Sequence, residues 1–258
     1  MTGDKFIIPR RKFLTGAALG GGGLLLSGCD MLSENEGFRS VLRSGEVLNK
    51  TAQRLIMDRS ALAREFSASD ISPTFKANGS ITGGTPEYAR HVADKFTGWQ
   101  LRIDGMVRNP LSLSLAQLIA MPSREQITRH DCVEGWSAIG KWRGTPLGLL
   151  LKQAGLMTKA RYIVFHCADQ WGPGVPYYES VDLVDAFHPQ TILAWSMNDG
   201  ILPVKHGAPL RLRVERQLGY KQAKYVMRVE ATDDLKKFYG GNGGYWEDAH
   251  DYDWYAGI

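Results

Sequence analysis

Cys132 is the residue of this chain whose type and surroundings best fit metal chemistry. A thiolate is a soft ligand that selects soft or high-valent metal ions. A free cysteine is more often a small buried hydrophobic residue, but Arg129 and His130 precede Cys132 and Glu134 follows it. Cationic neighbours lower the pKa of a thiol and favour the thiolate that a metal needs. The segment therefore predicts a metal site, and a metal bound by cysteine indicates a redox enzyme.

The other cysteines of the chain add no second redox centre. Cys29, Cys132 and Cys167 form no paired framework, and the sequence contains neither C-x-x-C nor the C-x-x-C-H motif of covalent haem. We therefore expect electrons to reach or leave the site through a separate protein.

The distribution of charge argues against nucleic acid as a partner. The 258 residues include 31 basic and 27 acidic side chains, a net charge of +4. Residues 1–28 hold four of the basic side chains and one of the acidic ones, so the rest of the chain carries 27 against 26. This near balance provides no basic surface for a phosphate backbone.

The N-terminus has the composition of an export signal. Residues 9–14 read PRRKFL, and an apolar, glycine-rich stretch follows as far as LLLSGCD at residues 24–30. The apolar part is short for a membrane span. A twin-arginine leader exports a protein that has already folded, which suits an enzyme that receives its cofactor in the cytoplasm. We expect residues 1–28 to be this signal and the mature protein to be periplasmic or otherwise extracytoplasmic.

Cys29 is the expected site of lipid attachment. The run Leu26, Ser27, Gly28, Cys29 resembles a lipobox, in which the cysteine is acylated and becomes the new N-terminus. Two or three acyl chains hold a protein on a membrane where one chain does not. The alternative is an ordinary cleavage site beside an incidental cysteine.

Residues 29–70 are expected to comprise the lipid attachment and a helical tether. Apolar residues recur at helical spacing among many charges from Glu36 to about Phe66. The same pattern fits a docking surface, and the sequence does not separate the two. Residues 67–86 are rich in Ser, Gly, Thr and Pro, which predicts a loop. Residues 71–258 form the expected catalytic domain.

Short strands and short helices follow one another through this domain. Capping and turn residues predict a helix over 113–121, started by Ser112 or Ser114, and another that starts at Thr145 and Pro146 and ends at Gly155. Alternating or densely apolar runs predict strands at 99–103, 162–167, 191–197, 210–214 and 225–230. Mixed strands with scattered short helices indicate an α+β fold.

Two blocks of the sequence resemble one known family. The run CVEGWSAIGKWRGTPL, residues 132–147, closely resembles the molybdenum-binding segment of the sulfite oxidase superfamily, particularly its bacterial branch that includes the catalytic subunit of periplasmic methionine sulfoxide reductase. Residues 188–230 look like the pterin-binding half of the same fold. The resemblance runs from about Phe75 to the C-terminus and implies the sulfite oxidase catalytic fold.

The resemblance implies a molybdenum cofactor. In this family the cysteine that matches Cys132 ligates molybdenum directly, and the dithiolene of molybdopterin supplies the other sulfurs, so we expect the non-nucleotide form of the cofactor. Glu134 lies two residues beyond the ligand. It is either a catalytic residue near the metal or a partner in a structural ion pair.

The resemblance also assigns residues to a cofactor pocket, which must offer cationic donors to a phosphate and neutral groups to the pterin edge. His206 and Arg211 match positions that contact the cofactor, although the reductase branch has an asparagine where His206 stands. Cys167 occupies a position where that branch has a threonine, and it either touches the pterin or packs in the core. Gly207 permits a close backbone approach. The other implied positions are Phe75, Asn78, Gln222, Ala223 and Lys224, with Lys224 as the charge partner of the phosphate.

Leader and motifs together predict an exported molybdopterin-dependent oxidoreductase that performs oxygen-atom transfer. The arginines that follow the cysteine in true sulfite oxidases are absent, so reduction of an S-oxide such as a sulfoxide is favoured over oxidation of sulfite. The alternatives are a sulfite dehydrogenase-like enzyme and a metal-free lipoprotein binding module with the same fold. The implied electron partner is a membrane haem b protein or a cytochrome c.

Overall fold

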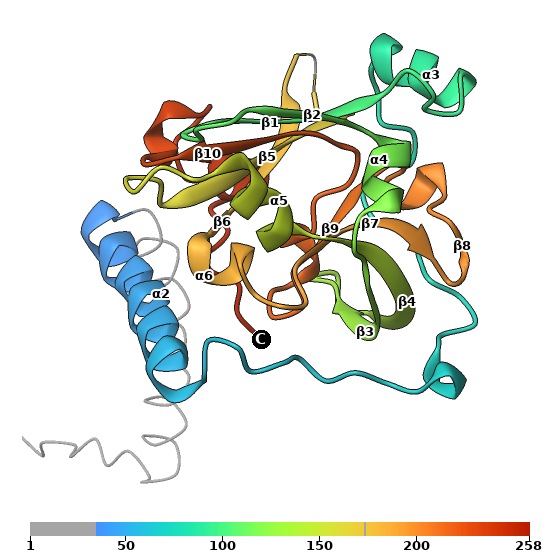
Figure 1. The fold of residues 1–258 in the computed structure, drawn as a ribbon. Coiled ribbons are helices and arrows are strands. Elements are labelled where there is room, and N and C mark those ends of the chain that lie inside the picture. The colour runs from blue at the N-terminus through green and yellow to red at the C-terminus, as the bar shows by residue number, and fades with distance from the viewer. Residues whose placement is uncertain (1–34, 173) are drawn as a thin grey trace, which may run out of the picture. The chain divides into compact units, whose positions relative to one another are not determined.

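The computed structural model describes residues 35–172 and 174–258 (Figure 1). The expected leader, residues 1–28, and Cys29 lie outside the described residues. Contacts along the chain divide it into two compact units, residues 1–52 and 53–258. The second unit contains both β-sheets and every residue expected in the cofactor pocket.

Helix α2, Glu36–Ile56, occupies the segment in which the sequence predicts a tether. The sequence predicts a helix as far as about Phe66, but α2 ends at Ile56. Just beyond it, the carboxylate of Asp58 accepts hydrogen bonds from the backbone N–H (2.7 Å) and the hydroxyl of Ser60. Such a side-chain bond gives the backbone an alternative to the helix. Within the described residues, no helix combines the length and the apolar character needed to cross a bilayer.

Two five-stranded sheets build the domain. The first has the strand order β2 (Leu111–Ser114), β1 (Gln100–Gly105), β10 (Val226–Thr232), β5 (Tyr162–Gln170), β6 (Pro176–Asp182), and only its β1–β10 pair is parallel. The second has the order β3 (Arg124–Asp131), β4 (Ser137–Pro146), β7 (Ile192–Met197), β8 (Gly200–Ile201), and β9 (Arg211–Arg213) also pairs with β7. All pairs in the second sheet are antiparallel.

The remaining elements are short helices, so the α+β prediction is confirmed. The α-helices are α3 (Pro86–Ala93), α4 (Leu115–Ala120), α5 (Leu147–Ala154), α6 (Leu183–Ala186) and α7 (Tyr245–His250). Single 3₁₀ turns occur at η1 (Ala68–Asp70), η2 (Val204–His206), η3 (Gly219–Lys221) and η4 (Leu235–Lys237). The turn η2 carries His206, and η3 ends directly before Gln222; the sequence assigns both residues to the cofactor.

The predicted helix ends are confirmed by their caps. Helix α4 begins after Ser114, whose side chain accepts from the N–H of Gln117 while the Gln117 side chain accepts from the N–H of Ser114. This reciprocal pair is a capping box, which satisfies two donors at the helix start. Helix α5 ends at Gly155, which has the left-handed φ of 70° typical of a glycine C-cap.

The main hydrophobic core joins the first sheet to α5 and to the second sheet. Its fully buried members include Ile103 of β1, Phe165 of β5, Val229 of β10, Leu150 of α5 and Leu193 of β7. In Figure 1 the first sheet lies toward the top, the strands β3 and β4 toward the bottom, and α5 between them. A smaller cluster around Phe75 and Trp142 supports the second sheet close to the pocket described below.

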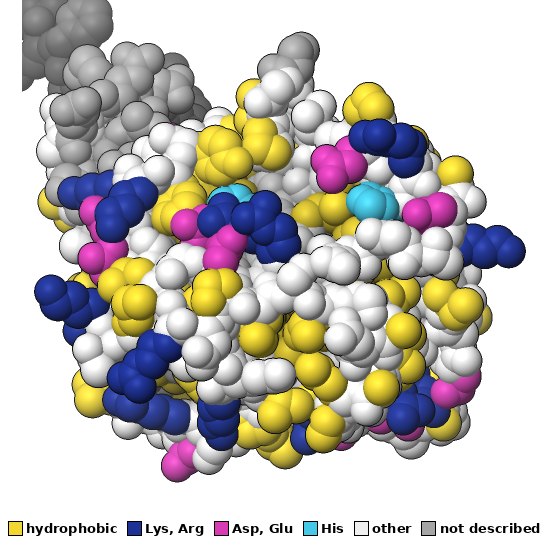
Figure 2. All heavy atoms as spheres, turned by 45° about the horizontal axis from the view of Figure 1, so that its top comes forward, with side chains coloured by type: hydrophobic (Ala, Val, Ile, Leu, Met, Phe, Trp, Pro, Cys, Tyr) yellow, Lys and Arg dark blue, Asp and Glu magenta, His cyan; other side chains and the backbone are white. Residues whose placement is uncertain are grey.

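Opposite charges alternate on the surface of the domain. Figure 2 shows basic and acidic side chains next to one another on the face it presents. On the first sheet, for example, Arg228 forms ion pairs with Asp104 and Glu230. This pattern agrees with the near-balanced charge of the body of the chain.

Candidate functional site

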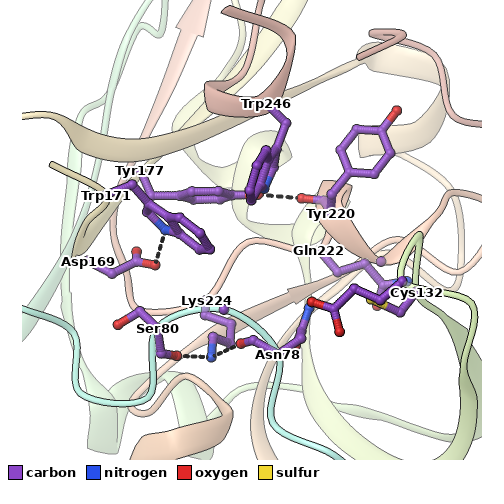
Figure 3. A pocket seen from close by; sticks show the side chains of 13 residues that line it. Asn78, Ser80, Cys132, Asp169, Trp171, Tyr177, Tyr220, Gln222, Lys224 and Trp246 are labelled. Carbon is purple, nitrogen blue, oxygen red and sulfur yellow. Dashed lines mark hydrogen bonds between the residues drawn. The ribbon is translucent and has the colours of Figure 1, made fainter. Parts of the chain in front are cut away.

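One pocket brings together residues from both sequence blocks (Figure 3). Its empty space is about 490 Å³, counting open solvent at the mouth. The lining residues are Asn78, Gly79, Ser80, Cys132, Glu134, Asp169, Trp171, Tyr177, Gly219, Tyr220, Gln222, Lys224 and Trp246. Five of them, Asn78, Cys132, Glu134, Gln222 and Lys224, are residues that the sequence assigns to the site.

Cys132 lies in the tight loop that joins β3 to β4. Its N–H donates to the carbonyl of Trp136 (2.9 Å), and its carbonyl accepts from the N–H of Gly135 (3.0 Å). These bonds close the loop, so the β3–β4 pairing fixes the position of the thiol. The side chain is half-buried and forms no disulfide.

The electrostatic environment of Cys132 differs from the sequence-based prediction. Burial raises the pKa of its thiol. A hydrogen bond from the backbone of Glu134 lowers this pKa, the charge of Glu134 raises it, and the cations Lys76 and Arg211 lower it. The adjacent Arg129 instead pairs with Asp131 at 2.9 Å, and His130 is fully buried. The prediction that Arg129 and His130 stabilise the thiolate was therefore wrong. A bound metal ion deprotonates a coordinating thiol by itself.

Glu134 is held at the pocket mouth as an anion. Its carboxylate accepts from the indole N–H of Trp136 (3.0 Å) and from the Nζ of Lys76 (3.2 Å). The hydrogen bond from Trp136, followed by the one from Lys76, lowers the pKa of Glu134. The structural ion pair considered for this residue is thus present, and the carboxylate still lines the pocket.

Lys224 uses its donors within the protein. Its Nζ donates to the backbone carbonyls of Asn78 (2.7 Å), Ser80 and Lys205 (3.1 Å). An ammonium group has three N–H donors, so these bonds leave none for a phosphate in this arrangement. Burial, followed by the charge of Arg211, lowers the pKa of Lys224 to about 7. The residue holds the 78–80 segment over the pocket, which is a different task from the predicted phosphate contact.

Arg211 is a buried cation with few hydrogen-bond partners among the described residues. Its side chain is fully buried, and only Nη1 has a protein partner, the carbonyl of His206 at 3.3 Å. Both Nε and Nη2 are buried without a hydrogen-bond partner. Burial, followed by the neighbouring Arg213, lowers the pKa of Arg211 to about 9. A buried guanidinium with free donors is costly unless an anion meets it.

Other polar atoms of the predicted site are also buried without a partner. They are Oδ1 of Asn78, Nδ1 of His206 and Oε1 of Gln222. Burial, followed by the charge of Arg211, lowers the pKa of His206 to about 4, so its imidazole is neutral near pH 7. Buried polar atoms in native proteins nearly always have a hydrogen-bond partner. This set of free donors and acceptors beside Arg211 fits a polar, anionic ligand such as molybdopterin.

Five residues of the predicted site are not among those that line the pocket. They are His206 and Arg211, described above, and Phe75, Ala223 and Cys167. Phe75 is buried beneath the site. Its ring packs edge-on against the rings of His206 and Trp142, with 5.7 and 5.4 Å between ring centroids. Ala223 is buried, and its carbonyl accepts from the N–H of Leu212. Cys167 belongs to the main hydrophobic core, which favours the packing alternative considered for it.

Glycine is needed at positions 207 and 219 because the backbone there lies close to other residues. Gly207 has a φ of 109°, and a Cβ there would stand 2.8 Å from the Cβ of Lys224. A Cβ on Gly219 would stand 2.5 Å from Nε2 of His130. Only glycine allows η2 to reach Lys224 and η3 to reach the end of β3 without displacing these side chains.

Sequence reasoning missed Asp169 and the aromatic wall of the pocket. Asp169 is 3% exposed, its Oδ1 has no partner, and its Oδ2 accepts from Nε1 of Trp171 (3.3 Å). Burial raises its pKa to about 6. Figure 3 shows it on the opposite side of the pocket from Cys132. Strand alternation gave no signal for this residue, because the β5–β6 register shifts between His166 and Gln170.

Trp246 reaches the pocket from the aromatic C-terminal stretch. It lies on α7 and meets Trp171 edge-on, with 4.9 Å between ring centroids. Lys221 is fully buried and forms one ion pair with Glu179 and another with Glu247. These pairs attach α7 to β6 and η3 and so fix the position of the aromatic wall.

The site thus combines one cysteine thiol with buried donors for an anionic organic ligand. Within residues 35–172 and 174–258, no cluster of three His, Cys, Asp or Glu side chains is arranged to hold a metal. The remaining ligands of a metal at Cys132 would have to come from a cofactor. Residues 88–239, more than half of the chain, match the family model of the oxidoreductase molybdopterin binding domain. The chain belongs to this family of molybdopterin-binding oxidoreductases, which confirms the fold and cofactor class predicted from the sequence.

Sequence relatives of this chain include subunits of methionine-sulfoxide reductases. A putative protein-methionine-sulfoxide reductase subunit YedZ1 from Azospira oryzae is 37% identical over 248 residues, which cover 96% of this chain and 87% of that protein. The protein-methionine-sulfoxide reductase catalytic subunit MsrP from Xanthomonas axonopodis pv. citri is 38% identical over 151 residues. That match covers 55% of this chain and 47% of MsrP. This chain therefore matches about half the length of that catalytic subunit.

A solved structure with a partial likeness is the sulfane dehydrogenase SoxCD from Paracoccus pantotrophus. The TM-score is 0.48 and the sequence identity is 23%. The likeness covers 53% of this chain and 38% of the SoxCD chain.

Proposed function

We propose that this protein reduces a neutral S-oxide, such as a sulfoxide, by oxygen-atom transfer at a molybdenum site. The observation that carries this proposal is the charge of the pocket lining. Its charged residues are Glu134, Asp169 and Lys224, and the ammonium group of Lys224 is occupied by three carbonyls. No arginine is among the lining residues. Sulfite is an anion and would meet the carboxylate of Glu134, whereas a sulfoxide is a neutral dipole.

The aromatic wall supports the same substrate class. Trp171, Tyr177 and Trp246 line the pocket, and sulfur groups make favourable contacts with aromatic rings. Apolar substituents on the sulfur of a sulfoxide would pack against these rings and exclude water. The relatives named as methionine-sulfoxide reductases point to methionine sulfoxide in proteins as the substrate to test first.

Residues of this chain would bind and orient the cofactor. Cys132 would supply the metal's protein ligand, and Arg211 would meet an anionic group of molybdopterin with the N–H donors of Nε and Nη2. Asn78, His206 and Gln222 would bind polar groups of the cofactor, since each has a buried atom without a partner. The bound molybdenum cofactor supplies the two-electron chemistry by which an oxygen atom is transferred. We assign the non-nucleotide form of the cofactor.

Glu134 is assigned to the reacting side of the pocket. Its carboxylate is anionic near pH 7 because the hydrogen bonds from Trp136 and Lys76 lower its pKa. Two residues from Cys132, this charge disfavours anionic substrates and orients the positive sulfur end of an S-oxide dipole. Phe75, Cys167 and Ala223 support the pocket from beneath or beside it.

Export and membrane attachment belong to the proposal. Residues 1–28 would be a twin-arginine signal, residues 29–70 would carry the acylated Cys29 and the helical segment, and residues 71–258 would form the catalytic domain. The protein would then work in the periplasm or another extracytoplasmic space. It would receive electrons from a separate membrane haem b protein or a cytochrome c.

A sulfite dehydrogenase-like activity is the second candidate. His206 favours it, because the sulfite oxidases resemble this chain at that position more than the reductases do. The anionic Glu134 at the pocket mouth opposes it.

One experiment separates these activities. The exported protein is analysed for molybdenum and pterin and is then assayed with artificial electron carriers for methionine sulfoxide reduction and for sulfite oxidation. We expect one molybdenum site per chain and turnover of the sulfoxide. Turnover of sulfite alone would reverse the assignment of substrate, and a protein without molybdenum or pterin would leave a binding module with this fold.

A further inference from the structure

Helix α2 has an exposed apolar stripe along one face. Phe38, Val41, Leu48 and Leu55 follow one another at intervals of three, seven and seven residues, which places them on the same side of a helix. Their exposed fractions are 36%, 66%, 69% and 81%. Single apolar residues on a surface need no explanation, but a continuous exposed stripe marks an interaction surface.

The composition of α2 fits a membrane surface. Its 21 residues include the basic residues Arg39, Arg43, Lys50 and Arg54 against the acidic Glu36 and Glu46, a net charge of +2. Of these basic residues, Arg54 pairs with Asp182 and Asp185 of the domain. The apolar stripe alternates with these charges, so the helix is not apolar enough to cross a bilayer. An amphipathic helix of this kind lies in the bilayer interface, where basic residues attract anionic lipids.

The position of α2 in the sequence brings it to a bilayer. Only residues 30–35 separate Cys29 from the first residue of the helix. Six residues reach at most roughly 20 Å when extended. Acyl chains on Cys29 would therefore keep the start of α2 within reach of the lipid headgroups.

We propose that α2 lies flat on an anionic bilayer with Phe38, Val41, Leu48 and Leu55 inserted among the lipid headgroups. This inference rests on the lipid anchor proposed above and adds a second membrane contact to it. The two contacts together would restrict how far the protein moves from the membrane.

Neighbouring residues of α2 provide a matched test. Leu48 is 69% exposed on the stripe, and Val47 is 64% exposed about 100° around the helix. The full-length protein, Leu48→Glu and Val47→Glu are each reconstituted into vesicles of phosphatidylethanolamine and phosphatidylglycerol. Amide hydrogen exchange is then measured separately for α2 and for the sheets. We expect exchange in α2 to be about tenfold faster in Leu48→Glu than in the other two proteins, with no change in the sheets.

Equal exchange in all three proteins would overturn the inference. Protection of α2 that appears only when the electron-donating protein is added would assign the stripe to that partner instead. Mass spectrometry of Cys29 tests the anchor independently. If Cys29 is not acylated, the exchange rates of the same three proteins with added vesicles still decide whether α2 binds lipid. Turnover with artificial electron carriers tests the proposed function separately.

Discussion

Arg211 and Arg213 are two residues apart and fully buried, yet they have opposite roles. Arg213 donates to both carboxylate oxygens of Glu215, at 2.9 and 2.6 Å. In Arg211, Nε and Nη2 have no hydrogen-bond partner among the residues that the structure describes. Arg213 is therefore complete in the folded chain, whereas Arg211 requires a ligand.

This contrast predicts opposite effects of two matched substitutions. Arg211→Met removes an uncompensated buried charge, so the cofactor-free protein should become more stable to urea while molybdopterin retention falls by about tenfold or more. Arg213→Met leaves Glu215 buried and unpaired and should cost about 3–5 kcal/mol of unfolding free energy. Urea denaturation and pterin analysis measure the two effects. An Arg211→Met protein that keeps its pterin would remove Arg211 from the site.

His206 predicts a pH dependence of stability. Its pKa is about 4 in the folded protein and about 6.5 in an unfolded chain. Between these values only the unfolded state binds the proton, so stability is complete above pH 6.5 and is lost as the pH falls toward 4. The difference corresponds to about 3 kcal/mol. His206→Asn should flatten this part of the stability curve of the cofactor-free protein. An unchanged curve would show that His206 has the same pKa in the folded and unfolded states.

At the scale of elements, the ion pairs of Lys221 hold the pocket wall together. Lys221 lies in η3, Glu179 in β6 and Glu247 in α7, and the Lys221–Glu247 distance is 2.5 Å. Burial lowers the pKa of Lys221, but the two carboxylates outweigh it and raise the pKa overall. Tyr220 and Gln222, on either side of Lys221, line the pocket.

Lys221→Met should therefore destabilise the domain. Removing the cation leaves two buried carboxyl groups together, at a cost of about 3–5 kcal/mol, measured by urea denaturation. The control is Lys237→Met, because Lys237 forms an exposed pair with Asp233 and such pairs contribute about 0–1 kcal/mol. Equal losses in the two variants would mean that the buried network contributes no more than a surface pair.

Elements with an apolar pattern were predictable from the sequence, whereas those with polar buried faces were not. Strands β5 and β7 and helix α5 agree with their apolar runs and caps. Strand β3 was missed because its inward residues are Gln126, Thr128 and His130. These side chains are buried for hydrogen bonding near the site, so the strand has no hydrophobic alternation to detect.

At the scale of the whole molecule, the fold brings together what the sequence separates. The sequence motifs identified the Cys132 loop and the 206–224 segment, and the structure places both around one pocket. Strand β5 contributes Asp169 to the pocket, and helix α7 contributes Trp246. These contributions were not predictable because they depend on how the first sheet and the C-terminal stretch pack against the pocket. A family motif contains the ligand-binding residues, whereas a pocket wall also depends on tertiary packing.

The central claim is that Cys132 ligates molybdenum held by molybdopterin. X-ray absorption at the molybdenum edge tests it most directly, on the wild-type protein and on Cys132→Ser, with Cys167→Ser as the control. We expect the Cys132→Ser spectrum to show one sulfur neighbour fewer than the wild type and the Cys167→Ser spectrum to be unchanged. The same number of sulfur neighbours in wild type and Cys132→Ser would contradict the assignment.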